Sequence, residues 1–176
     1  MKEIRVHGRG GMGAVTSAQV LAIAAFKDGK QSQAFPFFGV ARRGSPVEAY
    51  CRIDKDFIRV RQQVSEPDYV LILDKSLIDA VDVLKGVNRD STIIINSAKK
   101  IKLKTEAKVF HVDASKIALD TFGRNLVNTP ILGAFVKATG EVTLDSLNKT
   151  ILERFPEKIA KKNIEAIKKA YDACGE

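Results

Sequence analysis

The fold is decided close to the N-terminus, by the stretch Glu3-Ile4-Arg5-Val6-His7-Gly8-Arg9-Gly10-Gly11-Met12-Gly13-Ala14-Val15. Residues 3–7 alternate like a short strand, and the apolar spacing predicts a helix from about residue 14 to residue 27. Gly8, Gly10 and Gly13 lie in the turn between them with G-x-G-x-x-G spacing. Glycine is favoured there because it permits a tight turn and lets the backbone approach an anion beside the helix N-terminus. The stretch therefore indicates an α/β unit with a loop suited to binding.

Three interpretations of this loop differ in what it contacts. A dinucleotide-binding turn also needs an acidic residue about 20 positions on, at the end of the second strand, to hold the ribose. That strand end reads Ala34-Phe35-Pro36-Phe37-Phe38, and Asp28 falls too early, at the end of the helix. A nicotinamide or flavin dinucleotide is therefore disfavoured. Two interpretations remain: glycines needed only for packing at the helix terminus, and, as the favoured one, glycines that contact an anion or a partner protein.

The rest of the chain alternates predicted strands and helices. Strands are predicted at 32–38, 47–53, 57–63, 69–73, 92–95 and 109–112, and helices at about 76–85, 115–122, 124–138, 143–154 and 156–173. Segments 47–53 and 57–63 flank Asp54-Lys55-Asp56, which predicts an antiparallel hairpin, whereas continuous apolar runs such as 69–73 are typical of buried parallel strands. We predict one domain, residues 1–176, with an α/β fold: three α/β/α layers and a Rossmann-like, mostly parallel sheet with an antiparallel hairpin.

A second loop rich in glycine and arginine follows the predicted strand 32–38. It reads Phe38-Gly39-Val40-Ala41-Arg42-Arg43-Gly44-Ser45-Pro46. Arginines beside glycines bring a guanidinium and accessible backbone N–H groups to the same anion. We therefore predict cofactor-binding or partner-binding residues in both loops, namely Gly8, Arg9, Gly10, Gly11, Met12, Gly13, Arg42, Arg43, Gly44 and Ser45.

The formal net charge of +8, from 29 basic and 21 acidic residues, is unevenly distributed. Residues 1–61 carry +6, residues 62–98 carry −3 and residues 99–176 carry +5. The C-terminal excess is lysine, in the run 99–104 and on the outward side of the helix predicted at 156–173, where solvated lysine is the ordinary expectation. Because aromatic residues do not interleave with these lysines, a nucleic-acid-binding protein is disfavoured.

Catalytic chemistry is not predicted for this chain. Only two cysteines are present, Cys51 and Cys174, which excludes a four-thiolate zinc or iron–sulfur site. Asp74 and Asp113 each end a strand before a helix, and Asn96-Ser97 follows strand 92–95 in the same way. The carboxyl ends of parallel strands are where ligands bind in α/β folds, which makes these residues candidates for a ligand site. A carboxylate before a helix is more often a helix cap, which is the favoured interpretation. No apolar run approaches the roughly 18 residues of a membrane span, and residues 1–5 lack the apolar region of a signal peptide, so we expect a cytoplasmic location.

Several segments, taken in order, resemble the gamma subunit of pyruvate:ferredoxin oxidoreductase. They are His7-Gly8-Arg9-Gly10-Gly11-Met12-Gly13-Ala14-Val15, Gln33-Ala34-Phe35-Pro36-Phe37-Phe38-Gly39 with Arg42-Arg43-Gly44-Ser45-Pro46-Val47, Tyr69-Val70-Leu71-Ile72-Leu73-Asp74 and Asn128-Thr129-Pro130-Ile131-Leu132-Gly133-Ala134. The likeness extends over about residues 4–140, and the first two segments are specific to this group.

The resemblance implies a multi-subunit enzyme that oxidatively decarboxylates a 2-oxoacid to an acyl-CoA and reduces ferredoxin. The resemblance also implies that thiamine diphosphate and the iron–sulfur clusters belong to companion subunits, namely thiamine-binding and ferredoxin-like chains. The composition agrees, because this chain has only two cysteines and lacks a G-D-G thiamine motif. This chain is expected to be a scaffold and interface subunit that contributes to the coenzyme A path, with Phe35, Phe37 and Phe38 as candidate partner anchors. The alternatives are a gamma subunit for a branched-chain oxoacid or 2-oxoglutarate, and an autonomous Rossmann-type dinucleotide-binding protein.

Overall fold

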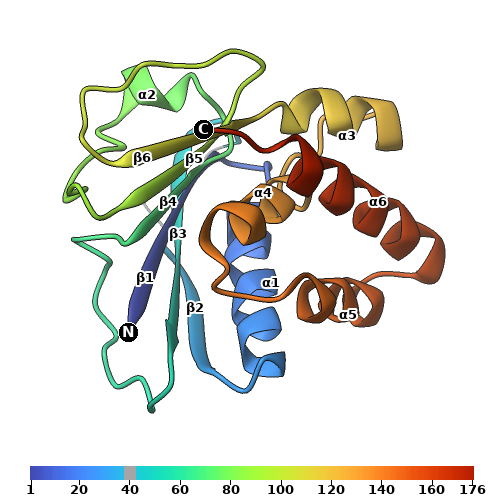
Figure 1. The fold of residues 1–176 in the computed structure, drawn as a ribbon, viewed down its shortest axis with the longest axis horizontal. Coiled ribbons are helices and arrows are strands. Elements are labelled where there is room, and N and C mark those ends of the chain that lie inside the picture. The colour runs from blue at the N-terminus through green and yellow to red at the C-terminus, as the bar shows by residue number, and fades with distance from the viewer. Residues whose placement is uncertain (38–42) are drawn as a thin grey trace.

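The computed structural model describes residues 1–37 and 43–176, and a six-stranded sheet runs through its centre (Figure 1). The strands are β1 (Lys2–Arg9), β2 (Gln31–Phe37), β3 (Pro46–Asp54), β4 (Tyr69–Ile72), β5 (Thr92–Asn96) and β6 (Lys108–Val112). They lie in the order β2-β3-β1-β4-β5-β6. The pairs β1–β4, β4–β5 and β5–β6 are parallel, whereas β3 is antiparallel to both β1 and β2. Of these strands, only β3 therefore runs against the common direction.

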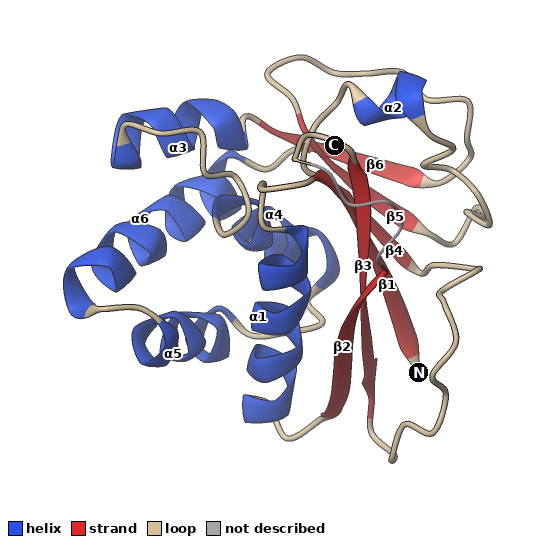
Figure 2. Cartoon of the chain, turned by 180° about the vertical axis from the view of Figure 1, so that it is seen from behind, coloured by secondary structure: helices blue, strands red, loops and turns tan. Residues whose placement is uncertain are grey.

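The helices are unequally divided between the two faces of the sheet (Figure 2). α1 (Ala14–Lys27), α3 (Ala114–Phe122), α4 (Pro130–Thr139), α5 (Leu144–Arg154) and α6 (Glu157–Ala173) lie on one side, and α2 (Leu77–Ala80) lies on the other. α1 packs on β1, β2 and β3, α4 packs on β5 and β6, and α5 and α6 pack in turn on α1 and α4. The α/β fold class is confirmed, and the layer on the second face consists of α2 and irregular segments.

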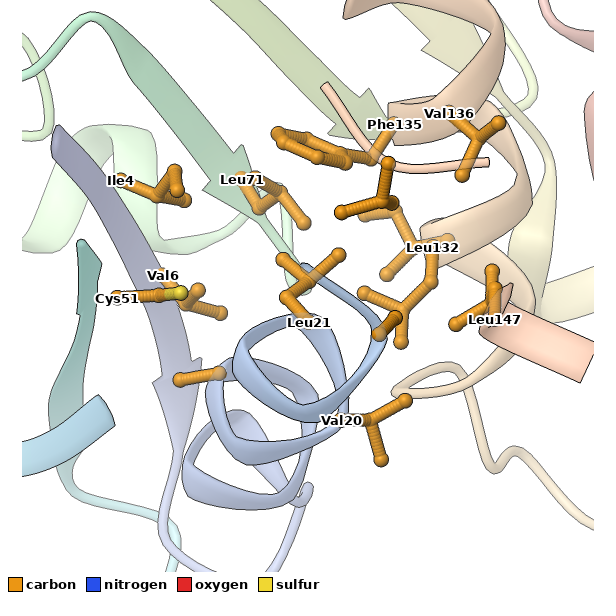
Figure 3. Close-up of a cluster of buried hydrophobic side chains, with 14 of the residues drawn as sticks. Ile4, Val6, Val20, Leu21, Cys51, Leu71, Leu132, Phe135, Val136 and Leu147 are labelled. Carbon is orange, nitrogen blue, oxygen red and sulfur yellow. The ribbon is translucent and has the colours of Figure 1, made fainter. Parts of the chain in front are cut away.

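Each face of the sheet has its own apolar core, because side chains alternate along the strands. On the helix side, Ile4 and Val6 of β1 are buried together with Leu21 of α1, Leu71 of β4 and Leu132 of α4 (Figure 3). Burying one such side chain contributes about 1.5–3 kcal/mol. The second core is smaller and joins the outward residues of β4 and β5 to α2. The helix-side core therefore fixes α1, and with it the turn that precedes α1.

The prediction of an antiparallel hairpin around Asp54-Lys55-Asp56 was wrong. Residues 57–63 form no strand, and the antiparallel partners of β3 are β1 and β2. The physical reason is Arg52, whose fully buried guanidinium donates hydrogen bonds to the carbonyl oxygens of Val60 at 3.4 Å and Gln62 at 2.6 Å. A side chain thus occupies acceptors that strand pairing would use. The segment is held to the sheet by Arg52 instead of becoming a strand.

Two predicted helices are shorter than expected. The helix predicted at 76–85 is limited to α2, because Val81 has extended backbone and Asp82 accepts a hydrogen bond from the Leu84 N–H. The helix predicted at 124–138 begins at Pro130, a residue well suited to the first helical turn. Pro36 lies within β2, where a proline is tolerated because β2 is an edge strand.

Candidate functional site

The two glycine loops lie side by side. The N–H of Gly10 donates to the carbonyl oxygen of Ser45 at 2.9 Å, and the N–H of Gly44 donates to the carbonyl oxygen of Gly10 at 3.1 Å. These bonds continue the antiparallel pairing of β1 with β3 past the strand ends. The structure therefore brings residues 8–13 together with residues 43–45, although more than 30 positions separate them in the sequence. Arg42 and Phe38 fall outside the described residues.

Gly8 and Gly13 are required by close packing. A Cβ at Gly8 would lie 3.0 Å from the Cβ of Ala14 and 3.2 Å from the Cδ1 of Leu73. Gly13 has a φ of +82°, and a Cβ there would lie 2.8 Å from the Nδ2 of Asn128. Two of the three spaced glycines thus let α1 approach β1, β4 and the segment before α4. The packing interpretation holds for these two positions.

Arg9 joins the two loops to the end of β4. Its Nε donates to Asp74 Oδ2 at 2.8 Å, and its terminal nitrogens donate to the Gly44 carbonyl at 3.0 Å and to Ser76 Oγ at 2.7 Å. Although partial burial opposes it, hydrogen bonds from Ser76 and Arg9 lower the pKa of Asp74. The Arg9 guanidinium is therefore already neutralised by a carboxylate. Its predicted role in holding an external anion would require it to leave Asp74.

Arg43 differs from Arg9 in having its charge free. Its side chain is exposed and forms no hydrogen bond or salt bridge within residues 1–37 and 43–176. Its Cγ lies 3.9 Å from the position of a Cβ at Gly11, so the arginine stem passes over the first loop. Among the loop residues that the structure describes, Arg43 is therefore the cationic side chain that an incoming anion can reach without breaking an existing ion pair.

A pocket of about 290 Å³ opens beside the first loop, at the carboxyl ends of β4, β5 and β6. Its lining consists of Met12, Leu73, Asp74, Lys75, Asn96, Ser97, Ala98, Asp113, Ser115 and Asn125. The carboxyl edge of parallel strands is where α/β folds bind ligands. Of this lining, only Met12 belongs to the predicted site. Six of the others directly follow β4, β5 or β6, which is the sequence signal that marks them: Leu73, Asp74, Lys75, Ser97, Ala98 and Asp113. Asn96 ends β5, Ser115 lies in α3, and Asn125 lies between α3 and α4.

The polar walls of this pocket are held in place by internal hydrogen bonds. Asn96 Nδ2 donates to the Leu73 carbonyl and to Ser115 Oγ, both at 2.9 Å, and its Oδ1 accepts from the Ser115 N–H at 3.1 Å. Asp113 accepts from the Lys116 N–H at 2.8 Å, so the predicted helix-cap role of Asp113 is confirmed. The lining contains Ser97 and Ser115, the carboxylates of Asp74 and Asp113, and Lys75. The internal hydrogen bonds give the pocket a fixed polar surface.

The sheet order bears on the dinucleotide interpretation. In a dinucleotide-binding unit the strand after the first helix lies next to the first strand. Here β3 lies between β1 and β2. The end of β2 is thus one strand away from the glycine loop, and it carries no carboxylate. Both observations disfavour a ribose site at this loop.

A buried polar network lies on β1 and β3, on the sheet face opposite α1. His7 Nε2 accepts a hydrogen bond from Arg5 Nε at 3.1 Å, so the neutral imidazole carries its proton on Nδ1. Nδ1 lies 3.6 Å from Glu48 Oε1, and Glu48 Oε2 accepts from the Tyr50 hydroxyl at 2.6 Å. Burial lowers the pKa of His7 to about 4 and raises that of Tyr50. Because His7 directly precedes Gly8, this network supports the strand that carries the first loop.

The two cysteines do not fit an iron–sulfur cluster. Cys51 is fully buried in β3, and burial raises its pKa to about 12. Cys174 is half-buried beside α4, where its thiol points to the Ala134 carbonyl at 3.7 Å. A cluster held by cysteines needs four thiolates. Within residues 1–37 and 43–176, no group of three or more His, Cys, Asp or Glu side chains is placed to hold a metal ion.

The described part of the chain contains no helix that is both long enough and apolar enough to cross a membrane.

Comparison with known proteins identifies the family. The family described as "Pyruvate ferredoxin/flavodoxin oxidoreductase" matches residues 3–173. "Pyruvate synthase subunit PorC" of Methanothermobacter thermautotrophicus is 55% identical over 172 residues, covering 98% of this chain and 95% of that protein. The "Pyruvate/ketoisovalerate oxidoreductases common subunit gamma" of Pyrococcus furiosus is 49% identical, covering 98% and 96%.

A solved structure extends this similarity to the fold. The crystal structure of pyruvate oxidoreductase subunit PORC from Thermotoga maritima is 37% identical, with a TM-score of 0.88 over 99% of this chain and 98% of that one. The resemblance in the glycine loops and the later segments is confirmed. This chain belongs to the pyruvate ferredoxin/flavodoxin oxidoreductase family, which it matches over nearly its whole length.

Proposed function

We propose that this chain is the gamma subunit of a pyruvate:ferredoxin oxidoreductase, a complex that oxidatively decarboxylates pyruvate to an acyl-CoA and reduces ferredoxin. The observation that carries the proposal is the end-to-end match at 49–55% identity to proteins named as PorC or gamma subunits. The geometry agrees with a binding role, because hydrogen bonds among Asn96, Leu73 and Ser115 fix the polar lining of the pocket beside the glycine loop. The chain acts as one domain, residues 1–176, in the cytoplasm.

Companion subunits supply the redox chemistry in this proposal. Thiamine diphosphate and the iron–sulfur clusters lie in thiamine-binding and ferredoxin-like chains, since the two thiols here are too few for a cluster. The Pyrococcus furiosus relative is named as common to pyruvate and ketoisovalerate oxidoreductases. A shared gamma subunit cannot itself distinguish two acids. Selection of the 2-oxoacid is therefore assigned to the companion subunits, with pyruvate as the substrate that most relatives' names support.

The two glycine loops form the edge that receives an anion. Arg43, together with Arg42, meets either the phosphates of coenzyme A or acidic groups of a companion subunit. Arg9 holds this edge in shape, because it ties Gly44 to Asp74 across the two loops. The backbone of Gly10, Gly11, Gly44 and Ser45 supplies the surface that an anion approaches, and Met12 forms the wall shared with the 290 Å³ pocket.

The companion subunits also contact the face of β2 and β3 that α1 leaves free. Phe37 is 41% exposed and Phe57 is 76% exposed, and both are large enough to anchor an interface. The ring of Phe35 packs on Tyr50 with a centroid separation of 5.2 Å, which leaves it half-buried. Of the two predicted partner anchors that the structure describes, Phe35 and Phe37, it is thus Phe37 that is better placed to contact a partner.

The experiment replaces Arg42 and Arg43 together by alanine in the reconstituted complex. We expect a higher KM for coenzyme A, or a loss of stoichiometric assembly, with KM for pyruvate unchanged. A control variant, Arg89→Ala with Arg124→Ala, removes the same charge from exposed sites outside the loops. If the double loop variant keeps both its coenzyme A kinetics and its stoichiometry, the anion-receptive edge is refuted.

A further inference from the structure

Residues 99–108 form a strongly basic segment between β5 and β6. Five of these ten residues are lysines and one is a glutamate; the lysines are Lys99, Lys100, Lys102, Lys104 and Lys108. All five are exposed, and none forms a salt bridge within the part of the chain that the structure describes. We call this segment the lysine segment. Its positive charge is not neutralised by the chain itself.

Three of the five lysines of α6 contrast with it. Lys161 pairs with Glu157, Lys168 pairs with Asp172 and Lys169 pairs with Glu165, each one helical turn apart. These pairs give the helix face a mixed charge, which is typical of a solvated helix. The sequence contains both lysine groups, but the pairing of three lysines in α6 and the unpaired state of the lysine segment among the described residues appear only in the structure.

The lysine segment is anchored although it has no regular secondary structure before Lys108, the first residue of β6. Ile101 and Leu103 pack into the second core, beside α2, and the Ile101 N–H donates to His111 Nε2 at 3.0 Å. At its start, Ser97 Oγ donates to the Lys99 carbonyl at 2.7 Å. The apolar residues alternate with lysines along this segment. When the apolar side chains pack inward, the side chains of Lys100, Lys102 and their neighbours therefore point outward. The charges are therefore held in one place, next to α2 on the face away from α1 (Figures 1 and 2).

The composition of this surface indicates the type of partner. None of the exposed large apolar side chains of the described chain lies between residues 97 and 112, whereas Phe37 and Phe57 are exposed near β2. Stable interfaces are rich in aromatic residues and poor in lysine, while unpaired surface charge chiefly speeds and orients encounter. The lysine segment thus fits a partner that docks and leaves. Since no aromatic ring is exposed among the lysines, an acidic protein fits better than a nucleic acid.

We propose that the lysine segment is an electrostatic docking surface for the acidic carrier protein that takes electrons from the complex. This inference rests on the proposed function, because the carrier is needed only if the chain works within a ferredoxin-reducing complex. The segment touches no reacting group. It raises the rate at which the carrier finds the complex and orients the carrier as it arrives.

The experiment uses the full complex with Lys100→Gln, Lys102→Gln and Lys104→Gln combined. A matched control on α6 combines Lys158→Gln, Lys161→Gln and Lys162→Gln, which removes the same charge. The probe is an acidic ferredoxin, with kcat/KM measured at several salt concentrations, and an uncharged dye serves as a second electron acceptor. We expect kcat/KM for ferredoxin to fall about tenfold at about 50 mM salt and the difference to vanish near 0.5 M. The control variant and the dye reaction should stay within about twofold of the wild type.

Three results would overturn the inference: unchanged ferredoxin kinetics, an equal loss in the α6 control, or an equal loss with the dye. Binding of single-stranded DNA that the triple variant abolishes, with ferredoxin kinetics intact, would assign the segment to nucleic acid and also overturn it. Failure of the chain to assemble with companion subunits would instead refute the proposed function. An assembled complex with unaltered ferredoxin kinetics refutes the docking surface alone.

Discussion

The buried neutral state of His7 should make the chain sensitive to mild acid. His7 lies in β1 directly before the first glycine loop, is 1% exposed, and accepts a hydrogen bond from Arg5. Its pKa is lowered from 6.5 to about 4, mainly by burial. Glu48 and Asp82 also face the ring and oppose this shift. The folded chain therefore binds fewer protons than the unfolded chain between pH 6.5 and pH 4.

The size of the effect follows from this window. Stability that His7 contributes above pH 6.5 is lost as the pH falls toward 4. The free energy of unfolding falls by about 1.4 kcal/mol for each pH unit, so the loss over the whole window is about 3 kcal/mol. Between pH 7 and pH 5 the expected loss is about 2 kcal/mol, which corresponds to a shift of about 1 M in the urea midpoint.

The assay compares urea unfolding of the wild type and of His7→Gln at pH 7 and pH 5. The glutamine amide can still accept a hydrogen bond from Arg5, but it does not titrate. We expect the variant to lose about 2 kcal/mol less stability than the wild type over this interval. Equal losses in the two proteins would refute the assignment of a buried, neutral His7, because all other titrating groups are shared.

Three further outcomes are expected. Gly13→Ala should destabilise the chain by about 2 kcal/mol or more, measured by chemical unfolding, because alanine is strained at positive φ and its Cβ would meet a neighbouring side chain. Arg52→Met should cost about 3–5 kcal/mol and make segment 57–63 sensitive to trypsin, since it removes a buried cation from its partners. Cys51 should resist a thiol reagent at pH 8 until the chain unfolds, while Cys174 reacts faster, because the first is fully buried and the second only half-buried.

Controls distinguish the loss of these specific contacts from a nonspecific loss of stability. Gly29 also has a positive φ, but a Cβ there would meet nothing within 4 Å, so Gly29→Ala should cost clearly less than Gly13→Ala. Equal costs would contradict the close-packing account of Gly13. For Arg52, trypsin cleavage that begins elsewhere than 57–63 would show that this arginine does not hold the segment.

Local pattern was sufficient for much of the fold. The continuous apolar runs at 69–73 and 92–95 predicted β4 and β5, and the spacing after Gly13 predicted α1 with the bounds observed. Segment 57–63 was assigned wrongly because its alternation resembles a strand. What prevents a strand is a long-range contact, the Arg52 guanidinium on its carbonyl oxygens, which no local pattern contains.

The candidate site stays a prediction, and the structure adds the arrangement of its described residues. Glycine and arginine marked both loops, and the structure brings their described parts together through Gly10 and Gly44. The sequence did not reveal that Asp74 neutralises Arg9, nor that Arg43 has no ion-pair partner within residues 1–37 and 43–176. The pocket lining was identified only in part. Asp74, Asp113 and Asn96-Ser97 were candidates at strand ends, with a helix cap as the favoured interpretation, and only the sheet order places the three strand ends together.

The most direct test of the central claim is purification of this chain, carrying an affinity tag, from its own cells under anaerobic conditions. The account predicts a complex of fixed stoichiometry whose other chains hold thiamine diphosphate and iron–sulfur clusters. That complex should reduce ferredoxin when supplied with pyruvate and coenzyme A. A chain that purifies alone, or with partners that lack both cofactors, would contradict the account.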